Sequence, residues 1–147
     1  MSNATEAKFG DPATRVAQTP HWTVLLRPKQ PTLGSLVLVC REPVLAFSAM
    51  SAAAYLDLRS VIRRVEPALC EVSAWERINY LMLMMVDRDV HFHVIPRYQG
   101  ARELEGVSYR DAGWPGPPDL DAAVAPEGAA RDALLERLRA AWDRAAG

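Results

Sequence analysis

Short apolar runs, separated by polar, Pro and Gly residues, predict several β-strands in the first two thirds of the chain. These runs are residues 13–18, which are weak in strand character, 22–26 (WTVLL), 35–40 (SLVLVC), 77–85 (RINYLMLMM) and 90–96 (VHFHVIP). The Pro- and Gly-containing segment 27–34 predicts a hairpin with a long loop between the second and third runs. The polar turn 87–89 predicts a second hairpin. In it, residues 77–85 fit a central strand buried on both faces, although a short helix fits the same run.

Two segments have helical periodicity. Ser51 is a good N-cap for a main helix. The apolar positions that follow at helical spacing are Tyr55, Leu58, Ile62, Val65 and Leu69. Pro67 is expected to kink or end this helix near its last turn, and residues 126–145 predict a C-terminal helix. Together the elements predict an α+β fold, with an antiparallel sheet of about five strands, one main helix and a C-terminal helix.

The length of 147 residues suits a single domain with its own core. We expect residues 1–12 to form a flexible N-terminal arm and residues 13–98 to form the domain that holds the sheet and the main helix. Residues 99–147 are expected to form a Gly/Pro-rich loop and a helix that packs on the same domain. Trp114 in that loop either packs on a hydrophobic surface or covers a pocket as a lid or partner contact.

Charge and composition narrow the possible partners. Seventeen basic and eighteen acidic residues give a formal net charge of -1, and no basic block stands out. Long nucleic acids are therefore not expected partners, whereas a small anionic ligand needs only a local pocket. No apolar run is long enough to cross a bilayer, and the polar start lacks a signal-peptide pattern, so we expect a cytoplasmic protein. Cys40 and Cys70 make no metal-binding CxxC pair.

A row of titratable residues marks the strand at residues 90–96. Residues two apart in a strand point to the same face, about 7 Å apart along the backbone, so His91 and His93 stand side by side. Asp89 is expected to share this face, and Val90, Phe92 and Val94 are expected to face the core. The strand is therefore expected to have a solvent-facing polar row and an apolar row behind it.

Three interpretations of the histidine pair are open. The histidines can belong to a surface strand and have no chemical role. They can share a metal ion, which would need further ligands such as His21 or a carboxylate, and no other spacing points to one. A neutral imidazole can also act as a nucleophile that attacks phosphorus and forms a phosphoramidate.

The third interpretation is favoured by a resemblance. Residues 89–97 (DVHFHVIPR) resemble the signature of the histidine triad family, in which three histidines alternate with apolar residues, often followed by Pro-Arg. Residues 31–39 (PTLGSLVLV) look like the Pro-Gly-His entry to the sheet in that family. The helix that begins at Ser51 and the run 78–85 also occupy positions that match the family's main helix and the strand before its triad. The resemblance covers roughly residues 14–98 and implies the histidine triad fold.

Catalytic roles follow from the resemblance by position. His91 matches the family's nucleophile, and His93 matches the histidine that contacts the phosphate and the leaving-group side. Asp89 stands where the family has its first histidine. An ionised carboxylate would favour a protonated ring and suppress attack if it contacted His91, whereas next to His93 it would hold a charged donor. The sequence leaves both contacts open.

Three further residues match the substrate pocket of the family. Leu26 and Arg27 lie near the expected positions of base and ribose. Arg27 either reaches the ribose or phosphate or is an exposed turn arginine. Asn79 either faces the phosphate or satisfies a backbone group.

The resemblance implies a nucleotide-binding hydrolase or nucleotidyl transferase that acts through a nucleotidyl-His91 intermediate. Its substrate would be a nucleoside phosphate derivative, such as a dinucleoside polyphosphate or a nucleoside phosphoramidate. No metal or cofactor bound by the protein itself is implied, and Mg²⁺ would arrive with a polyphosphate substrate. The family commonly forms two-fold homodimers. The alternative is a catalytically decayed protein of this family that acts as a nucleotide-binding or regulatory module.

Overall fold

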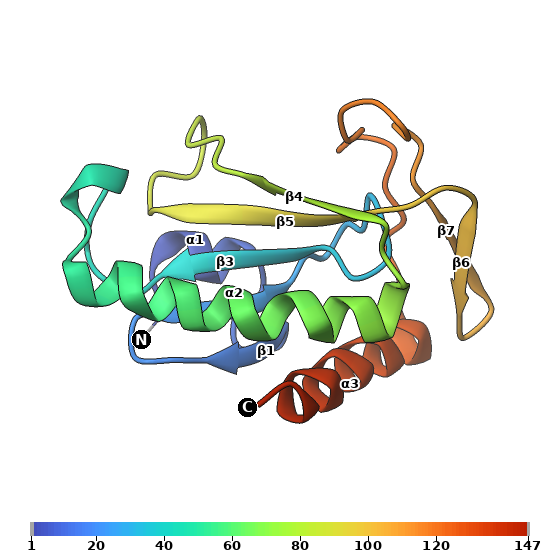
Figure 1. Cartoon of the computed structure of the whole chain (residues 1–147), viewed down its shortest axis with the longest axis horizontal. Coiled ribbons are helices and arrows are strands. Elements are labelled where there is room, and N and C mark those ends of the chain that lie inside the picture. Colours follow the sequence, from blue (N-terminus) through green and yellow to red (C-terminus); the bar gives the residue numbers. More distant parts are fainter. Residues whose placement is uncertain (1, 147) are drawn as a thin grey trace.

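A five-stranded antiparallel sheet forms the centre of the protein in the computed structural model, which describes residues 2–146 (Figure 1). The strands are β1 (Arg15–Gln18), β2 (Trp22–Leu26), β3 (Leu36–Cys40), β4 (Arg77–Leu81) and β5 (His91–Arg97). Their order across the sheet is β1-β2-β3-β5-β4. The predicted α+β class and both predicted hairpins are confirmed.

Strand β5, which carries the histidines, is paired on both sides. Val37 of β3 stands opposite His93, and Val39 stands opposite His91. On the other side of β5, Leu81 of β4 stands opposite His93. The ladder therefore holds the backbone at His93 from both sides and the backbone at His91 from the β3 side.

The prediction for residues 77–85 was wrong in its position and its length. Strand β4 lies at the edge of the sheet and ends at Leu81. The residues after it form a loop in which Leu83, Met85 and Val86 are 48%, 86% and 78% exposed. An unbroken apolar run is typical of a strand buried on both faces, but here the run divides into a half-buried edge strand and an apolar surface loop.

The main helix, α2 (Ala52–Ser73), begins where the sequence predicts. The Ser51 side chain accepts a hydrogen bond from the Ala54 amide and caps the helix. Pro67 does not end the helix, which continues to Ser73 and terminates at Ala74 in the left-handed conformation (φ 50°). A proline removes one intrahelical hydrogen bond, and the apolar face that α2 buries against the sheet compensates for this loss. The short 3-10 helix η1 (Phe47–Ala49) precedes α2.

The main core lies on the face of the sheet that α2 covers, together with the C-terminal helix α3 (Gly128–Arg144). Trp22 is fully buried there, and its indole Nε1 donates to the Ala54 carbonyl at 2.9 Å. Leu134, Leu138 and Trp142 of α3 extend the same core. Helix α3 therefore shares one core with α2 and the sheet. No helix within residues 2–146 has the length and apolar character needed to cross a bilayer.

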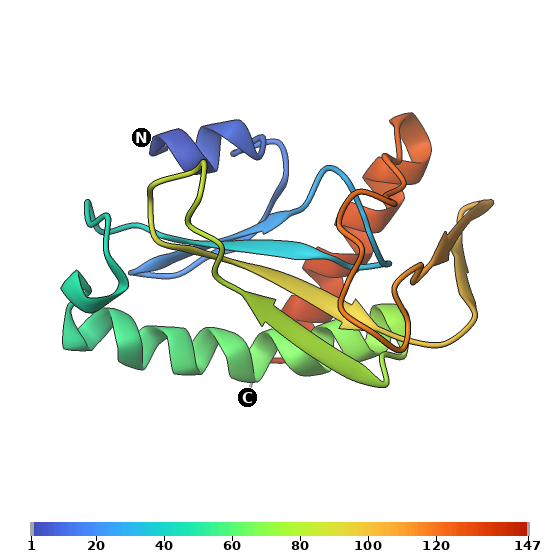
Figure 2. The same ribbon diagram turned by 90° about the horizontal axis from the view of Figure 1, so that it is seen from above.

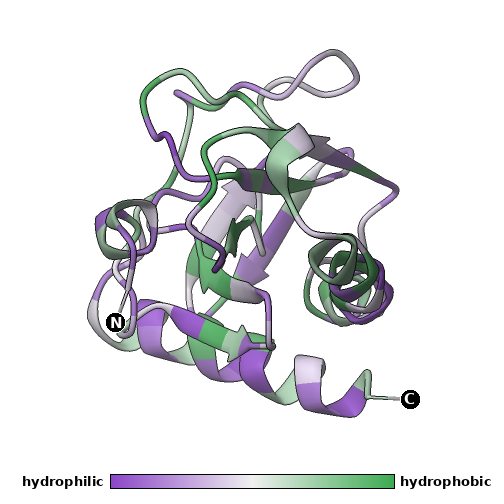
Figure 3. Ribbon diagram, turned by 90° about the vertical axis from the view of Figure 1, so that its left-hand side faces the viewer, coloured by the Kyte–Doolittle hydropathy of each residue, from purple (hydrophilic) through white to green (hydrophobic). Residues whose placement is uncertain are grey.

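A short helix, α1 (Ala4–Lys8), occupies part of the segment that we expected to be a flexible arm. The Asn3 side chain caps the Glu6 amide, and the Glu6 carboxylate accepts from the Asn3 amide. Glu6 is buried, and its other oxygen accepts from the Thr23 hydroxyl at 2.6 Å. Figure 2 shows α1 and α2 on opposite sides of the sheet, and Figure 3, which looks along α2, shows the strands between them.

A second, two-stranded sheet follows the histidine strand within the Gly/Pro-rich segment. It consists of β6 (Ala101–Leu104) and β7 (Val107–Arg110), a hairpin that the sequence analysis missed. Tyr109 of β7 is buried in the main core. Further along, Val124 bridges to Gln30, so the segment is fixed to the loop between β2 and β3.

Candidate functional site

His91 and His93 lie side by side on one face of β5, as predicted, but they are buried rather than solvent-facing. The two residues are only 2% and 6% exposed. The ring centroids are 5.3 Å apart, with the ring planes at 76°. Phe9, which follows α1, covers both rings at centroid distances of 6.5 Å and 5.7 Å. The expectation of an exposed row failed because the helix that covers it was not predicted.

The orientation of His91 is fixed by a backbone group. Its Nδ1 lies 2.7 Å from the carbonyl oxygen of Asp89. A carbonyl oxygen only accepts, so Nδ1 is assigned the proton. In the neutral ring this places the lone pair on Nε2, which has no hydrogen-bond partner among residues 2–146. The arrangement leaves one imidazole nitrogen available as a nucleophile.

His93 takes the opposite tautomer. The Arg27 Nε donates to His93 Nδ1 at 3.4 Å, and because arginine is only a donor, Nδ1 must accept. Burial, together with the charges of Arg27 and His91, lowers the pKa of His93 to about 4. The ring is therefore neutral near pH 7 and carries its proton on Nε2, where it can donate to an oxygen of a ligand.

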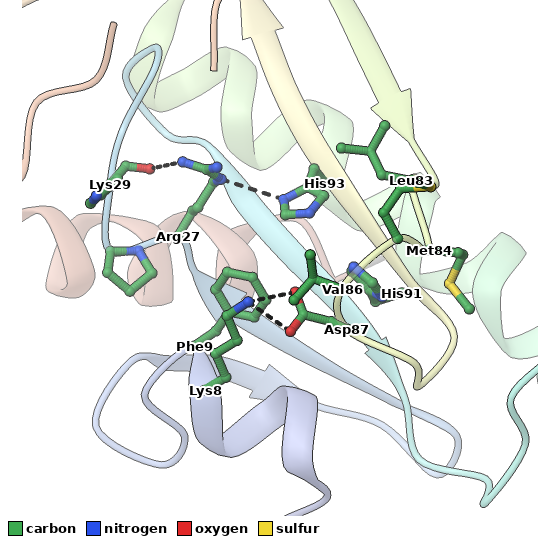
Figure 4. A pocket seen from close by; sticks show the side chains of 12 residues that line it. Lys8, Phe9, Arg27, Lys29, Leu83, Met84, Val86, Asp87, His91 and His93 are labelled. Atoms are coloured by element: carbon green, nitrogen blue, oxygen red, sulfur yellow. Dashed lines mark hydrogen bonds and ion pairs between the residues drawn. The ribbon is translucent and has the colours of Figure 1, made fainter. Parts of the chain in front are cut away.

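A cavity of about 480 Å³ opens beside the two histidines, within the range of small-molecule sites (Figure 4). We call it the histidine cavity. Three segments far apart in the sequence surround the imidazoles. The lining residues are Lys8, Phe9, Arg27, Pro28, Lys29, Leu83, Met84, Met85, Val86, Asp87, His91 and His93. The cavity therefore combines apolar walls with a few charged groups, a composition typical of ligand sites.

Two of the three cations in the cavity are already paired. Lys8 donates to both carboxylate oxygens of Asp87, at 2.7 Å and 2.9 Å. Arg27 donates to the Lys29 carbonyl at 2.6 Å as well as to His93. The ammonium group of Lys29 has no hydrogen-bond partner among the described residues, so it and the remaining guanidinium N–H groups of Arg27 are the cationic donors available to an anion.

Asp89 contacts neither imidazole through its carboxylate. Oδ2 accepts from the Thr5 amide at 3.1 Å and from the Thr5 hydroxyl at 2.8 Å. Asp89 precedes β5, which begins at His91, so its side chain need not point to the same face as those of His91 and His93. Only its backbone carbonyl meets His91. The predicted contact of the Asp89 side chain with a histidine or with substrate has no support from the geometry.

Two other predicted pocket residues lie elsewhere. Leu26 is buried in the main core beneath α2, and its neighbour Leu25 takes the histidine face instead. Asn79 accepts from Arg97 at 2.7 Å and lines a separate cavity next to Trp114. Neither residue lines the histidine cavity, because side chains alternate between the two faces of β2 and because Arg97 holds the Asn79 amide oxygen. Arg27 is the one predicted substrate-binding residue besides the histidines that lines it.

Sequence reasoning missed the other walls of the cavity. Lys8 and Phe9 come from the segment that was expected to be flexible, and residues 83–87 from a run that was expected to be strand. The spacing of Asn3 and Glu6 was the available signal for the helix before Phe9, because a capping residue followed three positions later by Glu marks a helix start. Within residues 2–146, no three His, Cys, Asp or Glu side chains are grouped so that they could hold a metal ion.

Comparison with solved structures identifies the architecture. A histidine triad protein from Bradyrhizobium japonicum has a TM-score of 0.75 and 21% identity, with 95% of this chain and 96% of that chain covered. One from Sinorhizobium meliloti has a TM-score of 0.71 and 19% identity, covering 94% and 93%. One from Marinobacter aquaeolei has a TM-score of 0.71 and 16% identity, covering 99% and 98%. The chain has the histidine triad fold.

The likeness is structural. No protein-family model matches the sequence, and no curated protein matches it. At these identities the resemblance establishes the fold along nearly the whole chain. A fold does not specify a function, which depends on the residues of the site.

Proposed function

We propose that this protein binds a nucleoside phosphate derivative in the histidine cavity and cleaves it through a nucleotidyl-His91 intermediate. The observation that carries the proposal is the hydrogen bond between His91 Nδ1 and the Asp89 carbonyl at 2.7 Å. It orients the ring and leaves Nε2 as the basic nitrogen, in a residue that lines a ligand-sized cavity. A neutral, oriented imidazole beside a site for an anion is suited to attack on phosphorus.

The chemistry divides into two displacements. In the first, the Nε2 lone pair of His91 forms a bond to the phosphorus, and the bond from phosphorus to the leaving group breaks with its electron pair, which takes up a proton from the solvent. In the second, water or another acceptor attacks the same phosphorus, loses a proton, and releases His91 with its lone pair restored. The acceptor decides between hydrolysis and transfer. The covalent intermediate thus replaces one direct attack of water on the substrate by two displacements.

Two kinds of donor can stabilise the charge that develops on the phosphoryl oxygens. His93 is neutral because burial lowers its pKa to about 4, and its Nε2–H can donate without bringing a second charge next to His91. Arg27 and Lys29 supply cationic donors from the opposite wall. Donors that are already oriented before the reaction stabilise a transition state more effectively than mobile ones.

The apolar part of the cavity suits the nucleoside. Phe9, Met84 and Val86 line it together with the histidines (Figure 4). A base stacks or packs on such surfaces, and the phosphate then lies toward Arg27 and the two imidazoles. Dinucleoside polyphosphates and nucleoside phosphoramidates meet this description. Any Mg²⁺ would enter with a polyphosphate.

The test is turnover of adenosine and guanosine phosphoramidates and of dinucleoside polyphosphates by the wild type and by His91→Ala. His21→Ala is the matched control, because His21 lies next to Asp57, outside the histidine cavity. We expect turnover in the wild type and in the control, and its loss by at least about a thousandfold in His91→Ala. Turnover that survives in His91→Ala would exclude His91 as the nucleophile. Nucleotide binding without turnover in the wild type would instead favour a binding module.

The proposal includes a cytoplasmic, two-fold homodimer. Strand β4 lies at one edge of the five-stranded sheet, and Tyr55 and Leu56 at the start of α2 are 39% and 68% exposed. An open strand edge and exposed apolar side chains both favour self-association. Light scattering coupled to size exclusion should give twice the monomer mass of 16.3 kDa, and a monomer mass at micromolar concentration would contradict this part.

A further inference from the structure

The Asp89 carboxylate binds α1, the helix next to the histidines. Its Oδ2 accepts both the amide and the hydroxyl of Thr5, at 3.1 Å and 2.8 Å. Thr5 is only 2% exposed. Hydrogen bonds to a carboxylate that are shielded from water are stronger than those between neutral groups. This contact therefore contributes substantially to the attachment of α1, which has only five residues.

The loop before β5 holds α1 at both ends. Asp89 binds Thr5 near the start of the helix, and Asp87 binds Lys8 at its last residue. A five-residue helix has little stability of its own, so its position depends on such contacts. Phe9 follows Lys8 directly and lies against both imidazoles. The two carboxylates therefore contribute to where Phe9 lies, together with the Glu6 carboxylate, which accepts from Thr23, and the Thr14 hydroxyl, which donates to the Phe9 carbonyl.

A histidine at position 89 could not make the same contacts. A carboxylate oxygen has two lone pairs and can accept two donors, as Asp89 Oδ2 does here. A neutral imidazole has a single acceptor nitrogen. Replacement by histidine would therefore leave at least one buried donor of Thr5 unpaired, and an unpaired buried donor weakens the attachment of α1.

We infer that Asp89 is a positioning residue of the histidine cavity: its carboxylate anchors α1 through Thr5 and thereby places Phe9 against His91 and His93. The side chain at the first position of the histidine row builds a wall of the cavity and makes no contact with the reacting atoms. The departure from histidine at this position is then a condition of activity in this chain. The inference concerns the same site as the proposed function, but part of its test needs no substrate.

The decisive variant is Asp89→His, because two accounts of the site predict opposite signs. If Asp89 is a decayed catalytic position, restoring the histidine should raise turnover. If Asp89 anchors α1, Asp89→His should lower kcat/KM by roughly tenfold or more, as expected for the loss of buried, charge-assisted hydrogen bonds that place a wall of the cavity. Higher turnover in Asp89→His than in the wild type would overturn the inference.

Thr5→Val is the matched variant on the other side of the contact. It removes the hydroxyl donor, keeps the amide donor and substitutes no residue that lines the histidine cavity. We expect the same direction of change with a smaller size, about threefold. Asp89→His combined with Thr5→Val should be little worse than Asp89→His alone, because both remove the same contact. Independent, multiplying losses would contradict the coupling.

Amide hydrogen exchange and the titration of His93 supply readouts without substrate. In Asp89→His the amides of residues 5–9 should exchange at least tenfold faster, while those of β3 and β5 stay protected, which shows that the variant is folded. Displacement of Phe9 from the imidazole should also let the pKa of His93 rise from about 4 toward its ordinary value. Arg27, His91 and Asp87, which also face His93, do not lie on α1. Lys8 does, and because its charge lowers the pKa of His93, its displacement acts in the same direction.

These readouts separate the inference from the proposed function. If the wild type neither binds nor cleaves nucleotides, the proposed function fails, and the exchange and titration results still decide the inference. Unchanged exchange of residues 5–9 together with an unchanged His93 titration in Asp89→His would overturn the inference even if turnover falls.

Discussion

The two faces of the central sheet are built differently. On one face, α2 and α3 cover a large core in which residues such as Trp22 and Leu38 are fully buried. On the other, a short helix and Phe9 cover the small cluster Leu25, Val37 and Val39 next to the histidines. The first face is stabilised by apolar area, and the second is held by a few hydrogen bonds and ion pairs from the loop before β5. A cavity for a ligand is compatible with the second kind of packing and not with the first.

The largest effect on stability should come from the α2 face. Trp22→Ala removes a fully buried indole and its hydrogen bond to Ala54, so the free energy of unfolding should fall by about 3–5 kcal/mol. Urea denaturation measures this directly. A loss below about 1 kcal/mol would show that the two faces do not differ in the way described.

The histidine face should instead make stability depend on pH. The folded state holds the pKa of His93 at about 4 because burial disfavours the charged ring, whereas the unfolded value is about 6.5. The contribution of this group is complete above about pH 6.5, and about 3 kcal/mol of stability is lost as the pH falls toward 4.

His93→Gln should remove this part of the pH dependence. The comparison of wild type and variant by urea denaturation between pH 4 and 7 isolates it from other groups that titrate in the same range. Identical slopes for the two proteins would mean that His93 is not buried in its neutral form.

Phe9→Ala should have a smaller effect on stability and a visible effect on the site. Phe9 is only partly buried, so its removal should cost about 1 kcal/mol. Water would then reach His93, and its pKa should rise from about 4. Phe47→Ala is the control: Phe47 packs on Phe92 and Tyr55 instead, so a similar loss of stability should leave the His93 titration unchanged. An equal response of His93 in both variants would contradict the role of Phe9.

Arg27→Gln should give the smallest change. The positive charge of Arg27 is one of the causes that lower the pKa of His93, after burial, so its removal should raise that pKa. Lys29→Gln is the control, since the Lys29 side chain makes no hydrogen bond to His93 among the described residues. NMR titration of the His93 imidazole measures its pKa in both variants. A decrease of the pKa in Arg27→Gln would contradict the assigned geometry.

The two faces also differ in how far the sequence predicts them. Ser51, the stripe that follows it and the strands under α2 obey simple periodicities, because packing against a large apolar core requires them. The alternation of β5 correctly places His91 and His93 side by side. What covers them could not be inferred in the same way, because α1 has only five residues and depends on contacts with Asp87 and Asp89, more than 75 positions along the chain. Contacts of this kind leave no periodic signal in the sequence.

The most direct test of the central claim is the stereochemistry at phosphorus. A nucleoside phosphoramidate or polyphosphate made chiral by sulfur at the attacked phosphorus would be turned over by the wild type in ¹⁸O-labelled water. The labelled oxygen makes the phosphorus of the product chiral, so its configuration can be determined. Each in-line displacement inverts the phosphorus, so the two displacements through His91 predict net retention. Inversion would mean that water attacks the substrate directly and would contradict a nucleotidyl-His91 intermediate.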